Sequence, residues 1–344
     1  MRIDIIENIH DFKRIKDVWN TLFNQIDEIT IFQSFEYNYY SWLYLLDKNK
    51  NHLALCLMYQ EEKLIAICPF YIDNRRRLRF INDKHSDNCD IISYSRIDID
   101  SLLKEISSKF KINSFHFINL NCNSKIFRYK TKKYAYFIDK CSAVYSVLDL
   151  NKGVFPDNFS DYKSKHKTEF RRILKKHMSK THIILNSKND TFPLQDIYSL
   201  RKKMIDNRVR SDNFLLSDQI RLIEKLYIEG RLKISIVKND HTINAISFVL
   251  CEKTNYLIWI DLYDSSKMIN LFNYVSLISS FSRTNEININ FGRGDYNYKI
   301  SNFLPKKKEL SSFYIFTKNG YKFIFIAEKL IISFLSKIYN ILRG

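Results

Sequence analysis

The chain has 344 residues, of which 45% are apolar and 27% charged, proportions that fit a globular protein and exclude a disordered or fibrous one. This length allows two domains, each with a core of its own. The 55 basic and 37 acidic residues give a formal charge of +18, which predicts an anionic partner. A nucleotide-bearing cofactor, a phospholipid surface, a polyphosphate-linked sugar and RNA all fit, and the charge does not choose among them.

The N-terminal part predicts two helices followed by a β-hairpin. Residues 10–23 place apolar side chains at helical spacing. Ser34 is positioned to cap a second helix, and Glu36 in the first turn of that helix favours the helix dipole. The apolar runs His52–Tyr59 and Lys63–Ile72, joined by three polar residues, predict the hairpin.

A polar stretch then precedes a helix at 101–110 and a strand at 115–120. Its basic residues, Arg75–Arg77 and Arg79, are interpreted as a solvated loop, with phosphate binding as the alternative. Asp87 and Asp90 lie three residues apart in a polar loop. They are either ordinary turn residues or carboxylates that orient a sugar hydroxyl or a substrate amine.

The composition changes after a strand at Tyr145–Leu150. The segment Asp161–Lys180 holds eight Lys and Arg residues, with Glu169 as the only acidic residue after its first position. Apolar residues at helical spacing make this a basic amphipathic helix, either a solvated face or a surface for anions. No RNA-binding motif accompanies it, and charge alone is non-specific.

The second half repeats the order of the first. We expect Ser217 to cap a helix that Gly230 ends, and Lys322–Arg343 to form a last amphipathic helix that packs on the core or contacts a membrane interface. The other predicted elements are strands at 182–185, 232–237, 243–250, 255–261, 287–291 and 310–316, and helices at 196–209 and 271–282.

The stretch Phe291–Lys299 is the strongest candidate for a site. Two of the six glycines, Gly292 and Gly294, stand here one residue apart, directly after a strand-like alternation. Glycine is needed where φ is positive or where the backbone must approach another group closely. A polar β-turn is the simpler interpretation.

The motif FGRGDYNYKISNFLP, from Phe291 onward, resembles the C-terminal pattern of the CelD-like acetyltransferase family. That family belongs to the GNAT superfamily and is distantly related to the Fem-type aminoacyl transferases of peptidoglycan. The runs Ile31–Tyr37 and His85–Ile92 also resemble family segments.

The resemblance implies an α/β (α+β) fold with two tandem GNAT-like domains, each a mostly antiparallel mixed sheet flanked by helices, plus a C-terminal amphipathic helix. The expected domain bounds are 1–145, 146–318 and 319–344. The implied activity is acyl transfer from acetyl-CoA or another acyl-CoA, as co-substrate, to an amino sugar or similar amine in surface-polysaccharide biosynthesis. A lipid-linked sugar is another acceptor that this context allows.

The resemblance also assigns roles to residues. Lys299 is expected to stabilise charge during transfer, Tyr298 or Tyr296 to donate a proton, and Asp295 to orient the amine. The predicted co-substrate ligands are Arg293, Gly294, Ser265 and Lys267, and the predicted acceptor ligands are Asp87 and Asp90. We expect the Gly-containing strand end to line a cleft and to hold Lys299 over the reacting carbonyl.

One departure from the superfamily pattern opens alternatives. The turn after the strand ending at Asp261, where a glycine would let the backbone approach a pyrophosphate, contains none. An aminoacyl-tRNA donor is therefore the main alternative, and a non-catalytic binding module at a membrane face is the other.

Further patterns narrow the function classes. The six cysteines show no CxxC and no histidine at ligand spacing, so we expect neither a metal nor a disulfide framework. We find no Ser/His/Asp order, H-E-x-x-H or P-loop in the sequence, so hydrolase, zinc protease and nucleoside triphosphatase functions lack support. Met1–Glu7 lacks a signal core, and no uncharged apolar run approaches 18 residues. The expected location is cytoplasmic, with peripheral contact at the inner face of the membrane as an option.

Overall fold

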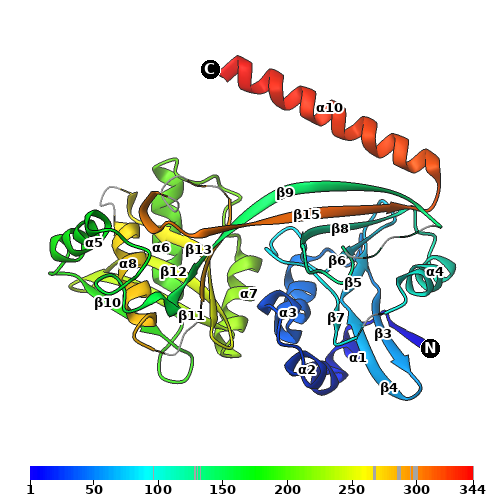
Figure 1. Ribbon diagram of the computed structural model, residues 1–344, viewed down its shortest axis with the longest axis horizontal. Coiled ribbons are helices and arrows are strands. Elements are labelled where there is room, and N and C mark those ends of the chain that lie inside the picture. The colour runs from blue at the N-terminus through cyan, green and yellow to red at the C-terminus, as the bar shows by residue number, and fades with distance from the viewer. Residues whose placement is uncertain are drawn as a thin grey trace. The chain divides into compact units, whose positions relative to one another are not determined.

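The chain divides into two compact units. The first comprises Met1–Trp42, Leu46–Ala143 and Glu309–Gly344, and the second comprises Leu43–Leu45 and Val144–Lys308. Figure 1 labels most of the helices and strands of both. The computed structural model describes residues 1–95, 97–127, 129, 131, 133–265, 269–284, 288–294, 296 and 301–343.

Over its described residues, the first unit combines two series of strands with four α-helices before residue 110 and one long helix near the C-terminus. One sheet has the order β1-β3-β4-β7, and a second series runs β15-β8-β6-β5-β2. Neighbouring strands are antiparallel except β6 and β8, which are parallel. The elements are β1 (Arg2–Ile6), α1 (Ile9–Arg14), α2 (Lys16–Asn24), α3 (Phe35–Leu45), β2 (His52–Leu53), β3 (Leu55–Gln60), β4 (Lys63–Cys68), β5 (Phe70–Ile72), β6 (Arg77–Phe80), β7 (Ile92–Ser93), α4 (Ile99–Lys109), β8 (Ser114–Asn121), β9 (Ala135–Asp149), β15 (Lys306–Phe316) and α10 (Asn319–Arg343).

Local sequence determines where several of these elements begin. The Ser34 hydroxyl accepts the backbone N–H of Tyr37 at 3.2 Å, so the predicted cap of α3 is confirmed. The predicted β-hairpin is confirmed as β3 and β4. The single helix expected at 10–23 is wrong in one respect, because the chain leaves helical geometry at Ile15 and forms α1 and α2 instead.

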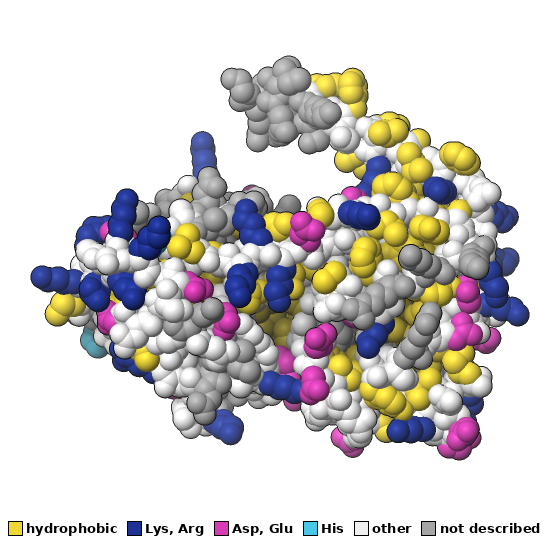
Figure 2. Space-filling model, in the orientation of Figure 1, with side chains coloured by type: hydrophobic (Ala, Val, Ile, Leu, Met, Phe, Trp, Pro, Cys, Tyr) yellow, Lys and Arg dark blue, Asp and Glu magenta, His cyan; other side chains and the backbone are white. Residues whose placement is uncertain are grey.

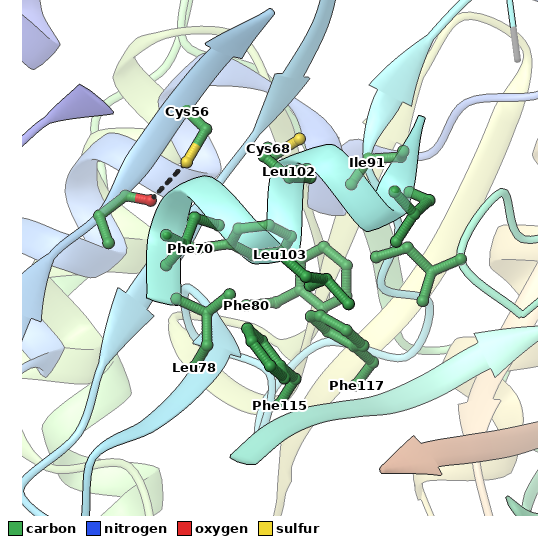
Figure 3. Close-up of a cluster of buried hydrophobic side chains, with 14 of the residues drawn as sticks. Cys56, Cys68, Phe70, Leu78, Phe80, Ile91, Leu102, Leu103, Phe115 and Phe117 are labelled. Atoms are coloured by element: carbon green, nitrogen blue, oxygen red, sulfur yellow. Dashed lines mark hydrogen bonds between the residues drawn. The ribbon is translucent and has the colours of Figure 1, made fainter. Parts of the chain in front are cut away.

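Aromatic side chains fill the core of the first unit. Phe70, Phe80, Phe115 and Phe117 pack together beneath α4, as Figure 3 shows. Burial of each such ring contributes about 1.5–3 kcal/mol relative to exposure. Cys56, Cys68 and Cys89 are buried in the same cluster and pack as small apolar residues.

The second unit contains one series of strands in the order β10-β11-β12-β13-β14-β9. Neighbours are antiparallel except β13 and β14. Helix α8 contacts β10 to β13 and α5, while α6 and α7 contact β11, β12 and β13. The elements are α5 (Ser164–Lys176), β10 (Thr181–Leu185), α6 (Leu194–Asp206), α7 (Ser217–Ile228), β11 (Leu232–Asn239), β12 (Thr242–Glu252), β13 (Asn255–Tyr263), α8 (Ile269–Phe281) and β14 (Asn288–Arg293).

Of the two predicted boundaries of α7, the structure contradicts the first and confirms the second. Ser217 is the first helical residue and not the cap, so that prediction is wrong; the backbone N–H of Leu216 is instead accepted by the Gln219 side chain at 2.9 Å. Gly230 follows the helix with a φ of 72°, as expected for a residue that ends a helix in the left-handed region.

The two units repeat one order of elements. In each, antiparallel strands lead to a helix, α4 or α8, and the strand after that helix pairs in parallel with an earlier one, β8 with β6 and β14 with β13. This is the tandem α/β architecture that the sequence predicts.

Candidate active site

Strands β13 and β14 are parallel, yet they pair only over a short length. Asn255–Leu257 lie opposite Asn288–Asn290, and the two strands form no other pair in the part of the chain that the structure describes. Strand β13 continues to Tyr263, paired on its other edge with β12. The backbone groups on this edge of β13 beyond Leu257 need other partners. Ligands of α/β sheets bind at the carboxyl ends of parallel strands, so the end of β13 is the candidate site.

A row of polar side chains crosses the sheet toward this end of β13. Ser235, Ser247 and Asp261 lie directly opposite one another on β11, β12 and β13, so they share one face of the sheet. Asn273 of α8 accepts from the Ser235 hydroxyl at 2.7 Å and donates to Ser247 Oγ at 2.9 Å. Ser247 donates to Asp261 Oδ1 at 2.6 Å. The row is thus a continuous hydrogen-bonded chain.

Asp261 and Tyr274 form the end of this row that is nearest the end of β13. The Tyr274 hydroxyl donates to Asp261 Oδ2, so both carboxylate oxygens accept hydrogen bonds. The Tyr274 side chain is buried, and its ring centroid lies 6.1 Å from that of Phe291 and 6.2 Å from that of Phe303. Asp261 is only half-buried. A fixed, partly exposed carboxylate of this kind is able to orient an amine or accept its proton.

His182 stands at the other end of the row. Its Nε2 lies 2.8 Å from Ser235 Oγ, and burial lowers the pKa of the imidazole to about 4. The ring is therefore neutral at neutral pH, and it fixes the serine without adding a charge to the row.

Sequence inspection alone missed Asp261, Tyr274 and the residues that hold them. The signal available was a polar residue interrupting an apolar run, as Asp261 does after Tyr256–Ile260, and Asn273-Tyr274 within the apolar sequence of α8. Register and helix orientation were needed to show that these interruptions meet.

The Gly-containing end of β14 has the positive φ angles that its two glycines suggested. Gly292 and Gly294 have φ values of 73° and 104°, a region that favours glycine. A Cβ on Gly294 would lie 2.4 Å from a ring carbon of Tyr296, which is 54% exposed. The Gly294 N–H donates to the Val144 carbonyl at 2.9 Å, which ties the strand end to β9.

Both flanks of the motif are anchored in the second unit. Phe291 and Phe303 stack with centroids 5.2 Å apart, and the Tyr162 hydroxyl donates to the Phe303 carbonyl at 2.7 Å. Phe170 of α5 stacks on the other side of Phe303. Arg293, half-buried at the end of β14, lies opposite Tyr145 of β9.

Four of the predicted site residues, Asp295, Tyr298, Lys299 and Lys267, lie outside the described residues, so their roles stay predictions. Ser265 follows β13 and accepts a long hydrogen bond, 3.5 Å, from Asn207. Tyr296, Arg293, Gly294 and Ser265 all belong to the second unit, whereas Asp87 and Asp90 belong to the first.

Asp90 braces a loop of the first unit. Its Oδ1 accepts from the Ile91 N–H at 2.9 Å and from Ser124 Oγ at 3.0 Å, and its Oδ2 accepts from the Lys125 N–H at 2.9 Å. Burial nevertheless raises the pKa of the carboxyl to about 6. Asp87 is 6% exposed. These contacts explain Asp90 as a structural residue, and its predicted contact with an acceptor remains a prediction.

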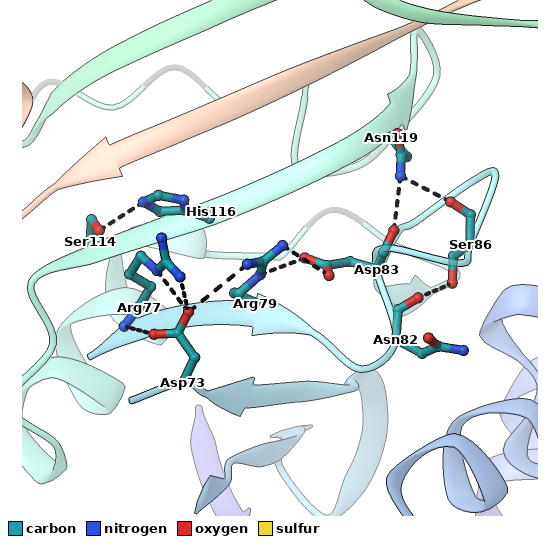
Figure 4. Close-up of polar contacts among 9 residues, drawn as sticks. All are labelled: Asp73, Arg77, Arg79, Asn82, Asp83, Ser86, Ser114, His116 and Asn119. Carbon is teal, nitrogen blue, oxygen red and sulfur yellow. Dashed lines mark hydrogen bonds and ion pairs between the residues drawn. The ribbon is translucent and has the colours of Figure 1, made fainter. Parts of the chain in front are cut away.

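Arg77 and Arg79 of the first unit belong to an ion-paired network, shown in Figure 4. Arg79 donates to both oxygens of Asp83, at 2.8 and 3.1 Å, and Arg77 contacts Asp73 at 2.6 Å. Arg79 is 12% exposed and lies in β6. The interpretation of Arg77 and Arg79 as part of a solvated loop is therefore wrong, because aspartates four residues away in sequence neutralise them within the fold.

Helix α5 is amphipathic, as predicted. Phe170 and Ile173 are buried, while most of the basic residues on the opposite side are exposed. Arg171 pairs with Asp157 at 2.7 Å and Arg172 with Glu169 at 2.7 Å, both on the surface where such pairs contribute little. The lysines of this segment keep the surface strongly cationic.

A comparison with protein-family models and with curated proteins found no match. Among solved structures, the C-terminal domain of a protein assigned as a lysylphosphatidylglycerol synthetase from Agrobacterium fabrum has a TM-score of 0.59 at 10% identity, covering 93% of this chain and 97% of that one. FemX has a TM-score of 0.58 at 9% identity, covering 94% and 100%. A tandem GNAT protein from the clavulanic acid biosynthesis pathway has a TM-score of 0.52 at 8% identity, covering 91% and 98%.

These similarities establish the fold, two tandem GNAT-like domains, which is similar to the folds of these three structures. The broader GNAT and Fem-type expectation is confirmed at the level of fold. The comparisons give no support to the CelD-like family in particular. Among the described residues, no helix has the length and apolar content needed to cross a membrane.

Proposed function

We propose that the protein is a GNAT-type N-acyltransferase. It moves an acyl group from acetyl-CoA or another acyl-CoA to an amine, with an amino sugar or similar amine of surface-polysaccharide biosynthesis as acceptor. The observation that carries the proposal is the pair formed by Asp261, on β13 beyond the point where β14 stops pairing with it, and Tyr274 of α8. The shared tandem GNAT fold and the CelD-like motif at Phe291–Phe303 support it.

The transfer needs an uncharged amine and a stabilised oxyanion. The amine nitrogen attacks the thioester carbonyl carbon, the C–N bond forms, and the C–S bond breaks. Asp261 accepts the proton that the amine releases, and Tyr274 holds the carboxylate in place. Lys299 stabilises the oxyanion, and Tyr296 or Tyr298 protonates the departing thiolate.

The remaining proposed roles concern binding. Arg293 and Lys267 supply positive charge for the phosphates of the acyl-CoA, Ser265 supplies a hydroxyl group, and Gly294, without a side chain, lets the co-substrate approach the backbone. For the acceptor, the proposed ligands are Asp87 and Asp90.

A second donor is favoured by specific observations. The exposed basic surface of α5, the net charge of +18 and the missing glycine after Asp261 suit a charged tRNA better than a free nucleotide. The fold is also that of FemX. The alternative proposal is therefore a Fem-like aminoacyl-tRNA-dependent transferase. A non-catalytic binding module at the inner face of the cytoplasmic membrane is the third.

The donor is identified by incubating the purified full chain with acetyl-CoA, a panel of other acyl-CoAs or a pool of aminoacylated tRNA. Aminated sugar nucleotides serve as acceptors, and mass spectrometry detects the product. We expect an acylated amine from an acyl-CoA. Product from charged tRNA alone selects the Fem-like alternative. Absence of product with every donor, together with no thermal stabilisation by any of them, contradicts both transferase proposals and leaves the binding module.

A further inference from the structure

In its described residues, helix α10 contacts the rest of the first unit through Phe325 and Lys329. The Phe325 ring packs against Tyr314 and Phe316, with centroids 4.5 and 5.4 Å away. One turn later Lys329 forms an ion pair with Asp139. These contacts orient the first half of the helix, because two residues on the same side are held by buried or half-buried partners.

The side of α10 that faces away from these contacts is apolar and exposed. Its residues recur at intervals of three, four and seven, the spacing of a single helical face. In Figure 2 hydrophobic side chains are visible along the described part of α10. The exposed fractions are 70% for Phe323, 58% for Ile324, 66% for Leu330, 59% for Ile331, 64% for Phe334, 57% for Leu335 and 38% for Ile338.

Such a continuous row of large apolar side chains is unusual on a folded chain and indicates a partner. Two kinds of occupant bury a helical face of this shape: a second copy of the chain, or the boundary between lipid head groups and acyl chains. The charges of the helix distinguish these two kinds of occupant.

The charges of this segment are almost all positive. Lys318 and Lys322 lie at its start, and the sequence adds Lys337 and Arg343, against a single acidic residue, Glu328, while the charge of Lys329 is paired with Asp139. A second copy would bring the same positive charge, whereas an anionic lipid surface brings the opposite one.

We propose that α10 binds an anionic lipid surface, lying in its plane with the apolar face from Phe323 to Ile338 among the acyl chains. Lys329 and its Asp139 partner keep the other side of the first half of the helix on the protein, whereas beyond them Ile332 on that side is 66% exposed. The proposal concerns a docking surface and is independent of the transfer chemistry in the second unit.

The test measures co-sedimentation of the full chain with vesicles, without any acyl donor. One vesicle preparation contains equimolar phosphatidylglycerol and phosphatidylcholine, and the other contains phosphatidylcholine alone. We expect strong binding to the anionic vesicles, weak binding to the neutral ones, and loss of binding as salt is raised. Phe334→Asp is expected to weaken binding at least about tenfold, since it removes a large inserted side chain.

Ser333→Asp is the matched control, because it adds the same charge one residue away, on an exposed position off the apolar face. It is expected to retain most of the binding, and Phe334→Asp is expected to melt at the wild-type temperature without lipid. No binding of wild type to anionic vesicles overturns the proposal. The proposal is also overturned if the two variants lose vesicle binding equally, or if Phe334→Asp melts at a lower temperature than wild type without lipid. A wild-type dimer that Phe334→Asp dissociates would overturn it as well.

Discussion

Asp261→Asn is the substitution that tests the chemistry of the polar row most sharply. It removes the negative charge and keeps the size and shape of the side chain. The new amide oxygen still accepts from Ser247, and the new amide N–H₂ donates to the Tyr274 oxygen once that hydroxyl has turned away. Two charge-assisted hydrogen bonds become neutral ones, each weaker by about 1 kcal/mol.

The free energy of unfolding is therefore expected to fall by about 1–3 kcal/mol, which leaves a domain of ordinary stability folded. The rate of acyl transfer is expected to fall much further, by roughly 10²–10⁴-fold, the usual contribution of a positioned general base. The gap between these two effects separates a chemical role from a structural one.

The assay compares initial rates of transfer and denaturant unfolding curves for wild type, Asp261→Asn and Asp240→Asn. Asp240 is a suitable control because it lies exposed in the turn between β11 and β12 with a φ of 52°, a conformation that asparagine tolerates. A wild-type rate in Asp261→Asn would refute the proposed role of the carboxylate. If the transfer rate falls only in proportion to the fraction of unfolded protein, the row of polar side chains is purely structural.

Three further predictions concern stability. Gly294→Ala should lower the free energy of unfolding by about 1–3 kcal/mol in chemical denaturation, because alanine is strained at a φ of 104°, whereas Gly320→Ala, with open space around it, should be neutral or slightly stabilising. Arg79→Met should cost about 3–5 kcal/mol by leaving Asp83 buried without its partner, and adding Asp83→Leu should restore most of this; an additive double variant would contradict the pairing. For Asp90 the folded pKa of about 6 lies above the ordinary value of 3.8, so its contribution to stability is complete below 3.8 and lost as the pH rises through 6. Asp90→Asn should flatten this part of the stability profile, and an unchanged profile would show that another group titrates there.

Local patterns in the sequence predicted much of the fold. The cap at Ser34, the hairpin of β3 and β4, and the amphipathic α5 each depend on a short stretch of sequence, and all three are present. The positive φ values at Gly292 and Gly294 likewise follow from the residue type.

The polar row was beyond such patterns because its members are distant in sequence. Ser235, Ser247 and Asp261 meet only through the register of three strands, and Asn273 joins them only because α8 lies over that face. The burial of Arg79 was missed for a similar reason, since a run of arginines looks solvated until the strand brings it to Asp83. Propensity and composition carry no information on such pairings.

Hydrogen–deuterium exchange of the full chain, with and without acetyl-CoA, tests most directly whether the donor binds at the end of β13. We predict slower exchange on donor addition at Ile258–Tyr263 and in the first turns of α8, with no change in β3 and β4 of the first unit. Unchanged exchange in the second unit, or protection confined to the first, would contradict the assignment of the active site.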